Sequence, residues 1–187
     1  MLQIRTYGNS ILRVKASPVV RIDRSVAELA EQMIELMLNR NGVGLAAQQV
    51  GETRRVFVMH VPPQYDVAEP NGKRLNPEID TPLVAINPVL LDKKGAQVDK
   101  EGCLSIPEIF APVHRAYEVF LSYLDIHGKE RRITVRGLMA RVVQHETDHL
   151  DGVLFVDRLS TIKKITLAAT LKAIKHNAER ELRSGRG

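Results

Sequence analysis

The segment His145-Glu146-Thr147-Asp148-His149 has residue types and a spacing that can bind a metal ion. It lies in a stretch predicted to be helical, where residues four apart share one face, so both imidazoles can bind the same ion. Glu146 follows the first histidine, where a carboxylate can accept a proton from water activated by that ion. The pattern predicts metal-assisted hydrolysis, although a helix with two surface histidines would show the same five residues.

A catalytic metal site needs a third protein ligand and an open position. The arrangement with a third downstream histidine is excluded because Phe155 occupies that place. The downstream acids lie in no recognisable ligand motif; they are Asp157, Glu179 and Glu181. Cys103 is the single cysteine and cannot form a disulfide within the chain. Its thiolate is the candidate third ligand, whereas without the histidine pair a lone cysteine is more often an inert buried residue.

A third stretch, Gly42-Val43-Gly44-Leu45-Ala46-Ala47-Gln48-Gln49, combines small residues with a polar end. It imitates a dinucleotide-binding loop, but such a loop must follow a strand, and here a predicted helix precedes it. Its glycines can let an extended peptide lie flat against the backbone, and Gln49 offers an amide donor. Taken alone, the stretch is more simply explained as a tight turn and a buried strand.

Hydrophobic periodicity predicts three helices that could position these residues, at 26–38, after Gly137 and at 161–182. Ser25 is the expected N-cap of the first. The expected apolar face of this first helix consists of Leu29, Met33, Ile34, Met37 and Leu38. In the second helix one stripe is formed by Leu138, Val142, His145 and His149. The apolar stripe of the third consists of Ile162, Leu167, Leu171, Ile174 and Ala178.

Strands are predicted at 55–61, 83–91, 117–126 and 131–135, with a hairpin between the last two. They cluster between the helices without the alternation of a parallel sheet. We therefore expect an α+β fold, with antiparallel β-sheets around a central metal-binding helix plus a C-terminal helix. The proline-rich stretch 62–82 is predicted to be an irregular loop.

The composition is that of one globular domain covering residues 1–187. Hydrophobic residues make up 44% and charged residues 26%, which excludes disordered, collagen-like and coiled-coil classes. No apolar run reaches the roughly 18 residues of a membrane span, so we expect a soluble, intracellular protein. Residues 158–187 carry eight basic and two acidic side chains, whereas the rest of the chain is nearly neutral. This basic C-terminal helix and tail, about 160–187, would attract a polyanion or form a solvated helix face.

The three stretches together resemble the motifs of the peptide deformylases. The family patterns GxGLAAxQ, EGCLS and QHExDHLxG match residues 42–49, 101–105 and 144–152 in the same order. The similarity extends from the segment 8–13 to the segment 157–160. Three separate blocks in the family's order cover most of the chain and make a chance match implausible.

The resemblance implies removal of the formyl group from the N-terminal formyl-methionine of new polypeptides. It implies one divalent metal ion, as a rule Fe²⁺, with Zn²⁺ or Ni²⁺ able to occupy the site. The ligand set by itself suits both iron and zinc and leaves the metal open. The implied metal ligands are Cys103, His145 and His149. Glu146 would be the general acid and base. Gln49 and the backbone N–H of Leu104 would stabilise the oxyanion.

Substrate contacts follow from helical spacing. Leu138 and Val142 share the face of His145, so we expect them to form the apolar pocket for the methionine side chain. Val43 and Gly44 would form the opposite wall. Ordinary packing of a helix against a sheet would produce the same stripe. We expect the 62–82 loop near the cleft, where it would alter access to the site.

The expected partners are formyl-methionyl nascent peptides and, through the basic C-terminal helix, the ribosome; no membrane or DNA partner is expected. The expected location is the bacterial cytoplasm, with an organellar origin left open. Two alternatives use the same residues: a zinc endoprotease built on the two histidines, and a basic ribosome-binding domain without activity. The Cys103 block and the complete set of site residues favour the deformylase.

Overall fold

The computed structural model describes residues 2–68 and 72–183. Its main sheet has five antiparallel strands in the order β1-β2-β5-β8-β9. These strands are β1 Gly44–Ala46, β2 Val56–Met59, β5 Leu83–Lys94, β8 Glu118–Leu124 and β9 Glu130–Arg136. A second sheet pairs β6 Gln97–Cys103 with β7 Ile106–Arg115, and a small hairpin pairs β3 Val67–Ala68 with β4 Lys73–Arg74.

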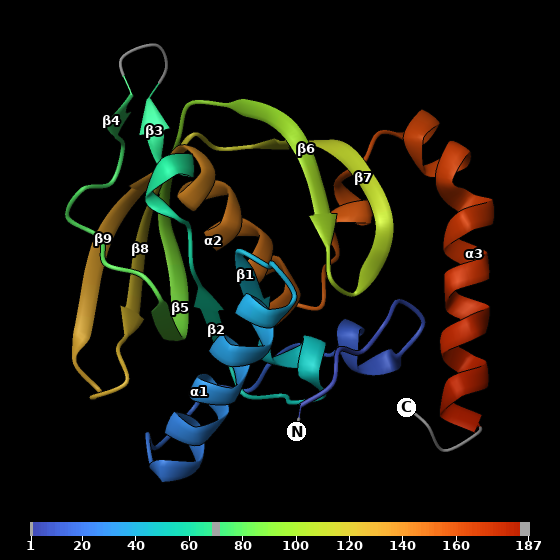
Figure 1. The fold of residues 1–187 in the computed structure, drawn as a ribbon, viewed down its shortest axis with the longest axis horizontal. Helices are drawn as coiled ribbons and strands as arrows, with labels where there is room; N and C mark the ends of the chain where they lie inside the picture. The colour runs from blue at the N-terminus through green and yellow to red at the C-terminus, as the bar shows by residue number, and fades with distance from the viewer. Residues whose placement is uncertain (1, 69–71, 184–187) are drawn as a thin grey trace.

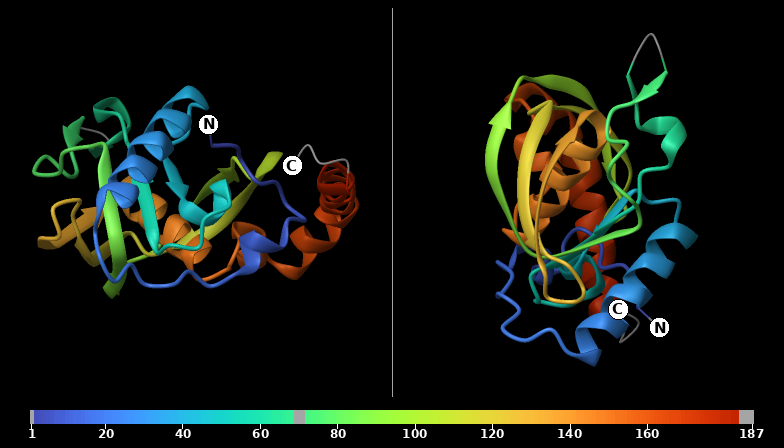
Figure 2. Two further views of the ribbon diagram at one scale, coloured as in Figure 1. Left: turned by 90° about the horizontal axis from the view of Figure 1, so that it is seen from below. Right: turned by 90° about the vertical axis from the view of Figure 1, so that its left-hand side faces the viewer.

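Three α-helices surround these sheets. They are α1 Arg24–Asn39, α2 Gly137–Leu150 and α3 Thr161–Arg183. Short 3-10 helices are η1 Ser10–Arg13, η2 Ala47–Val50, η3 Pro63–Tyr65 and η4 Phe155–Arg158. The helix α2 lies between the main sheet and the β6–β7 pair, and α3 stands at the opposite end of the molecule from β9 (Figures 1 and 2). The expected α+β architecture with a central helix and a C-terminal helix is confirmed.

Alternation along β2 explains how the main sheet separates two cores. Phe57 and Met59 pack in the cluster that contains the apolar side chains of α2. Val56 and Val58 point to the other face, toward side chains of α1. Because helices cover both faces, all four residues of β2 are buried.

The structure corrects three expectations about the helices. The N-cap of α1 is Asp23, not Ser25: the Asp23 carboxylate accepts the backbone N–H of Ser25 at 2.9 Å and that of Val26 at 3.3 Å. Leu38, expected on the buried face, is 43% exposed. In α3, Leu167, Leu171, Ile174 and Ala178 face the body as expected, but Ile162 is exposed. Both exposed residues lie at a helix end, where the neighbouring elements no longer cover the stripe.

The β6–β7 pair is the main element that sequence patterns missed. Three residues at the centre of β6 are exposed, so the strand shows no apolar alternation. The alternation in β7 is real from Ile109 onward, with Ile109, Ala111 and Val113 buried, but exposed Glu108 breaks it, and Pro107 and Pro112 are unfavourable in a strand. Prolines are tolerated here because the pair has only two strands, so each strand leaves one edge unpaired.

The 62–82 stretch is more regular than expected and contains η3 and the β3–β4 hairpin. Its buried Asn76 pairs with both backbone groups of Arg136: Oδ1 accepts the N–H at 2.8 Å, and Nδ2 donates to the carbonyl at 3.1 Å. Arg136 is the residue before α2. The described part of this stretch does not line the cleft described below. It therefore touches the beginning of α2 rather than the entrance to the site.

Within the residues described, no helix combines the length and the hydropathy that crossing a bilayer requires. Arg186, part of the expected basic tail, lies outside the described residues, as does everything after Arg183.

A surface ion pair joins η1 to η4. Both terminal nitrogens of Arg13 bind the Asp157 carboxylate, which also accepts the backbone N–H of Leu154 at 2.8 Å. Burial alone would raise the pKa of Asp157, but the hydrogen bonds from Arg13 and Leu154 outweigh it and hold the pKa below its ordinary value. A lowered pKa adds stability above the unfolded-state pKa, and this stability is lost as the carboxylate protonates.

We predict that Asp157→Asn lowers the free energy of unfolding at pH 7 by less than about 1 kcal/mol, since both side chains are partly exposed to solvent. The difference from wild type should shrink as the pH falls below about 4, where the wild-type carboxylate also loses its charge. Urea unfolding of both proteins at a series of pH values measures this difference in the free energy of unfolding. Glu28→Gln, in an exposed helical pair, is the control and should show little change at any pH. A difference that grows in acid would contradict the prediction.

Candidate active site

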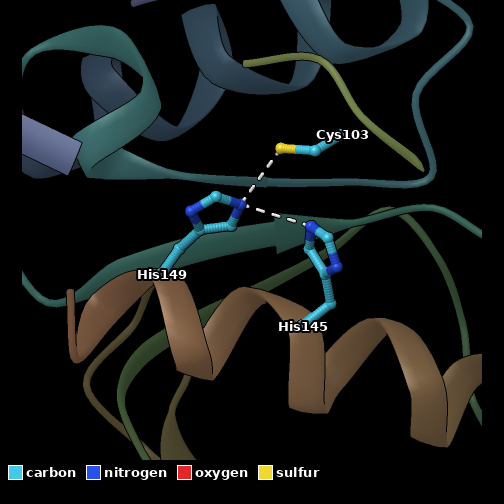
Figure 3. Close-up of side chains that lie close together, drawn as sticks. All are labelled: Cys103, His145 and His149. Atoms are coloured by element: carbon cyan, nitrogen blue, oxygen red, sulfur yellow. Dashed lines mark hydrogen bonds between the residues drawn. The ribbon is translucent and has the colours of Figure 1, made fainter. Parts of the chain in front are cut away.

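Two histidines of α2 and one cysteine of β6 converge in the interior (Figure 3). His145 and His149 are buried one turn apart, with their Nε2 atoms 3.2 Å from each other. Cys103 ends β6, just after a shift in the pairing register with β7. Its Sγ lies 3.2 Å from Nε2 of His149. The three residues predicted from separate motifs therefore meet at one point.

The donor set fits one metal ion. One atom from each of the three side chains lies within 4.8 Å of the other two. Tetrahedral bonds of about 2.0–2.3 Å hold ligand atoms roughly 3.3–3.8 Å apart, close to the two separations above. Nδ1 of His145 lies 3.0 Å from the Glu101 carboxylate, and a hydrogen bond there leaves Nε2 free to bind an ion.

Glu101 is the buried anion that orients His145. Its carboxylate accepts Arg115 Nε and Nη2, both at 2.9 Å, and Arg141 Nη1 at 2.7 Å. Burial by itself would raise the pKa of Glu101, but the hydrogen bonds from His145 and Arg115 outweigh it and hold the pKa far below its ordinary value. Arg115 also pairs with Asp148, which binds Arg158 at 2.7 Å. Glu101 is therefore ionised and held from three sides.

Glu146 is also buried, but its surroundings differ from those of Glu101. Its Oε2 has no hydrogen-bond partner among the described residues, and the side chain lines the cleft. Burial raises the pKa of Glu146 to about 7. A carboxyl group in this state can exchange a proton with a group that enters the cleft near neutral pH.

Gln49 is fixed by its own short helix. Its Oε1 accepts the backbone N–H of Ala46 at 2.8 Å, which turns the amide nitrogen the other way. Nε2 then lies 3.4 Å from Cys103 Sγ and 3.3 Å from Ser105 Oγ. Leu104 follows Cys103 in the turn between β6 and β7 and lines the same cleft. An amide donor is therefore held beside the cysteine.

The cleft has a volume of about 560 Å³. It is lined by all four residues expected to contact substrate: Val43, Gly44, Leu138 and Val142. Gln49, Cys103, His145 and Glu146 also line it. Gly44 must lack a side chain, because a Cβ there would lie 2.8 Å from a Val142 methyl group and would collide with the Glu146 carboxylate. The apolar wall and the polar groups thus belong to one cavity.

Sequence reasoning missed the arginines of this site. Arg115 and Arg141 are both buried, and Arg141 also lines the cleft. One signal was available for Arg141, since it lies four residues before His145 within an otherwise apolar helical stripe. No local signal marks Arg115, because its partners come from β6 and α2.

The polypeptide deformylase family model matches residues 1–165. The chain belongs to this family. A peptide deformylase of Dictyoglomus thermophilum is 44% identical over 156 residues, covering 83% of this chain and 91% of that protein. A peptide deformylase of Alkalilimnicola ehrlichii is 42% identical over 186 residues, covering 100% of this chain and 93% of that protein. The sequence-based family assignment is confirmed.

Solved deformylase structures share the fold. The enzyme of Synechococcus elongatus, in complex with actinonin, has a TM-score of 0.80 and 36% identity over 95% of this chain and 90% of that one. The enzyme of Thermus thermophilus also has a TM-score of 0.80 and 36% identity, and the match covers 95% of this chain and 99% of that one. Family membership assigns to this chain the metal-dependent removal of the N-formyl group from nascent polypeptides. The endoprotease and the inactive ribosome-binding alternatives are set aside.

We predict that Gly44→Ala lowers formate release from a formyl-methionyl peptide by about 10²-fold, because the added methyl group must displace Glu146 or Val142, and small misplacements carry costs of this size. Thermal unfolding checks that the variant is folded. The control is Gly72→Ala, which lies outside the cleft: an added Cβ meets no atom within 4 Å, and the positive φ of 63° should lower stability but not formate release. Full activity of folded Gly44→Ala would show that Glu146 does not need this space.

Proposed function

We propose that this chain deformylates formyl-methionyl peptides with Cys103, His145 and His149 as ligands of one divalent ion. The observation that carries the proposal is the convergence of one sulfur and two imidazole nitrogens within 4.8 Å, in a cleft that Glu146 also lines. An ion held there supplies Lewis acidity, which lowers the pKa of water and polarises a carbonyl group. We propose Fe²⁺ as this ion on the basis of the family, because the ligand set itself also suits Zn²⁺ and Ni²⁺.

The proposed proton carrier is Glu146. Its carboxylate lines the cleft and would accept the proton of the attacking water, then return it to the amine nitrogen as the bond between carbon and nitrogen breaks. Gln49 Nε2 and the backbone N–H of Leu104 donate to the formyl oxygen while negative charge develops on it. Support for the role of Gln49 comes from its hydrogen bond to Ala46, which fixes the donor before substrate arrives.

The proposed pocket for the methionine side chain lies between two walls of the cleft. Leu138 and Val142 of α2 form one wall, and Val43 and Gly44 at the beginning of β1 form the other. The absence of a side chain at Gly44 lets a substrate backbone approach Glu146 closely. Apolar contacts on both sides favour a long, flexible, apolar side chain.

We also propose that α3 docks on ribosomal RNA, which would place the enzyme at emerging chains in the bacterial cytoplasm. Support comes from exposed Lys163, Lys164, Lys172 and Arg180 on a helix whose apolar stripe already packs on the body. A row of exposed cations is attracted to phosphate in a manner that weakens with salt.

The deformylase proposal predicts that Glu146→Ala loses at least about 10²-fold in formate release. The protein is purified without oxygen, loaded with Fe²⁺ and assayed with a short formyl-methionyl peptide. Metal content is measured in parallel, because the substitution should leave the ion bound. A metal-loaded variant with wild-type activity would remove Glu146 from the mechanism.

The ribosome proposal predicts that reversing three charges, Lys163→Glu with Lys164→Glu and Lys172→Glu, reduces co-sedimentation with ribosomes at low salt. Formate release from a free peptide should not change, since these residues do not line the cleft. The matched control reverses the exposed residues Lys93, Lys94 and Lys129, which lie on β5 and before β9. Equal sedimentation of both variants would refute docking through α3.

A further inference from the structure

Phe110 of β7 is an exposed aromatic residue in the wall of the cleft. The residue is 68% exposed and lines the cleft, whereas its neighbours Ile109 and Ala111 are buried. A single exposed apolar residue elsewhere on a protein surface needs no explanation. One that lies in a binding cleft offers apolar surface to whatever enters that cleft.

An irregularity in the pairing of β6 with β7 sets the place of Phe110. Gly102 alone lies opposite the four residues 107–110. Within this bulge Glu108 has a φ of 63°, a left-handed conformation that residues other than glycine seldom adopt. Bulges often redirect a side chain beside a functional site, and strained backbone of this kind gathers at such sites. The flanking pairs are Glu101 with Ala111 and Cys103 with Ile106.

The ring of Phe110 lies against the backbone of Gly102. A Cβ added at Gly102 would lie 2.7 Å from the ring carbon Cδ1 and closer still to Cε1, so any side chain there would push the ring away. Gly102 directly precedes the proposed metal ligand Cys103, and both line the cleft. The bulge and the glycine therefore hold an exposed aromatic ring next to the backbone that carries this ligand.

The proposed methionine pocket does not use this ring. That pocket is formed by residues of α2 and β1, with Val43 just before β1, whereas Phe110 belongs to β7. A peptide whose first side chain fills the pocket extends along the cleft with its next residues. Successive side chains of an extended chain point in opposite directions, so the second and third residues present side chains to both sides of the peptide. A side chain from one of these two residues is the partner that fits the ring.

We propose that Phe110 packs against the side chain of the second or third residue of the substrate, so that the enzyme deformylates peptides with an aromatic residue there faster than peptides with alanine. This inference rests on the proposed function, because it extends the substrate class of the same cleft. Charge selects less strongly, since the exposed charged side chains that line the cleft have both signs. They are Arg40, Lys100 and Glu108.

The experiment measures kcat/KM of the Fe²⁺-loaded enzyme for three formyl-methionyl tripeptide amides. One has alanine at positions two and three, and each of the others has one phenylalanine, at position two or at position three. For the wild-type enzyme, at least one phenylalanine peptide should be about three- to tenfold faster than the alanine peptide, which is the size expected of an aromatic contact. Phe110→Ala should lower this ratio by about threefold or more, and the ratio cancels any loss that affects all substrates equally.

Tyr65→Ala is the matched control, because it removes an aromatic residue that is 61% exposed but does not line the cleft. It should leave the ratio unchanged. Phe110→Leu retains apolar surface and should keep part of the preference. Thermal unfolding checks that each variant is folded. An unchanged ratio in folded Phe110→Ala, or an equal fall in Tyr65→Ala, would overturn the role of Phe110.

The wild-type measurement keeps the proposal testable if Phe110→Ala does not fold. Phenylalanine peptides that are both no faster than the alanine peptide overturn the proposal, since neither side chain then gains a contact. In that case the alanine peptide is still deformylated, and the proposed function stands. Failure of all three peptides to release formate overturns the proposed function instead.

Discussion

The hydrogen bond between the buried Glu101 carboxylate and Nδ1 of His145 is the interaction on which the site depends. It holds the imidazole with Nε2 directed toward His149 and Cys103. A buried carboxylate is costly unless it is paired, and here Arg115 and Arg141 pair with it from two different elements. The ionic network therefore orders three parts of the chain at once: β6, β7 and α2.

The position of α2 makes that network possible. Twelve of its 14 residues are buried, because one side packs on the main sheet and another on the β6–β7 pair. A helix enclosed in this way keeps water away from the polar groups on its inner face, which strengthens their electrostatic interactions. The 62–82 stretch adds a constraint from outside the cleft, since Asn76 binds both backbone groups of the residue before α2. These hydrogen bonds hold the residue before α2 in place, two positions before Leu138, which lines the cleft.

Patterns in the sequence predicted the elements with strong periodicity and missed those without it. The three helices and the four longest strands of the main sheet were found because each carries apolar residues with a helical spacing, an alternating pattern or a continuous run. The β6–β7 pair was missed because its exposed side chains and its prolines hide the alternation. Ser25 was chosen as a cap in place of Asp23 because two capping residues lie close together, and only backbone geometry separates them.

Residue types at short, fixed spacings were enough to identify the family and to select the candidate site residues, because neither step depends on tertiary contacts. Two histidines one helical turn apart can bind one ion, and the two other motifs added Cys103 and Gln49 as candidates. Only the tertiary structure decided which charges hold these groups, because Glu101, Arg115 and Arg141 come from β6, β7 and α2 and meet through packing rather than through spacing. Tertiary packing also brings the buried cation of Arg141 into the cleft wall, since burial is a property of three-dimensional surroundings.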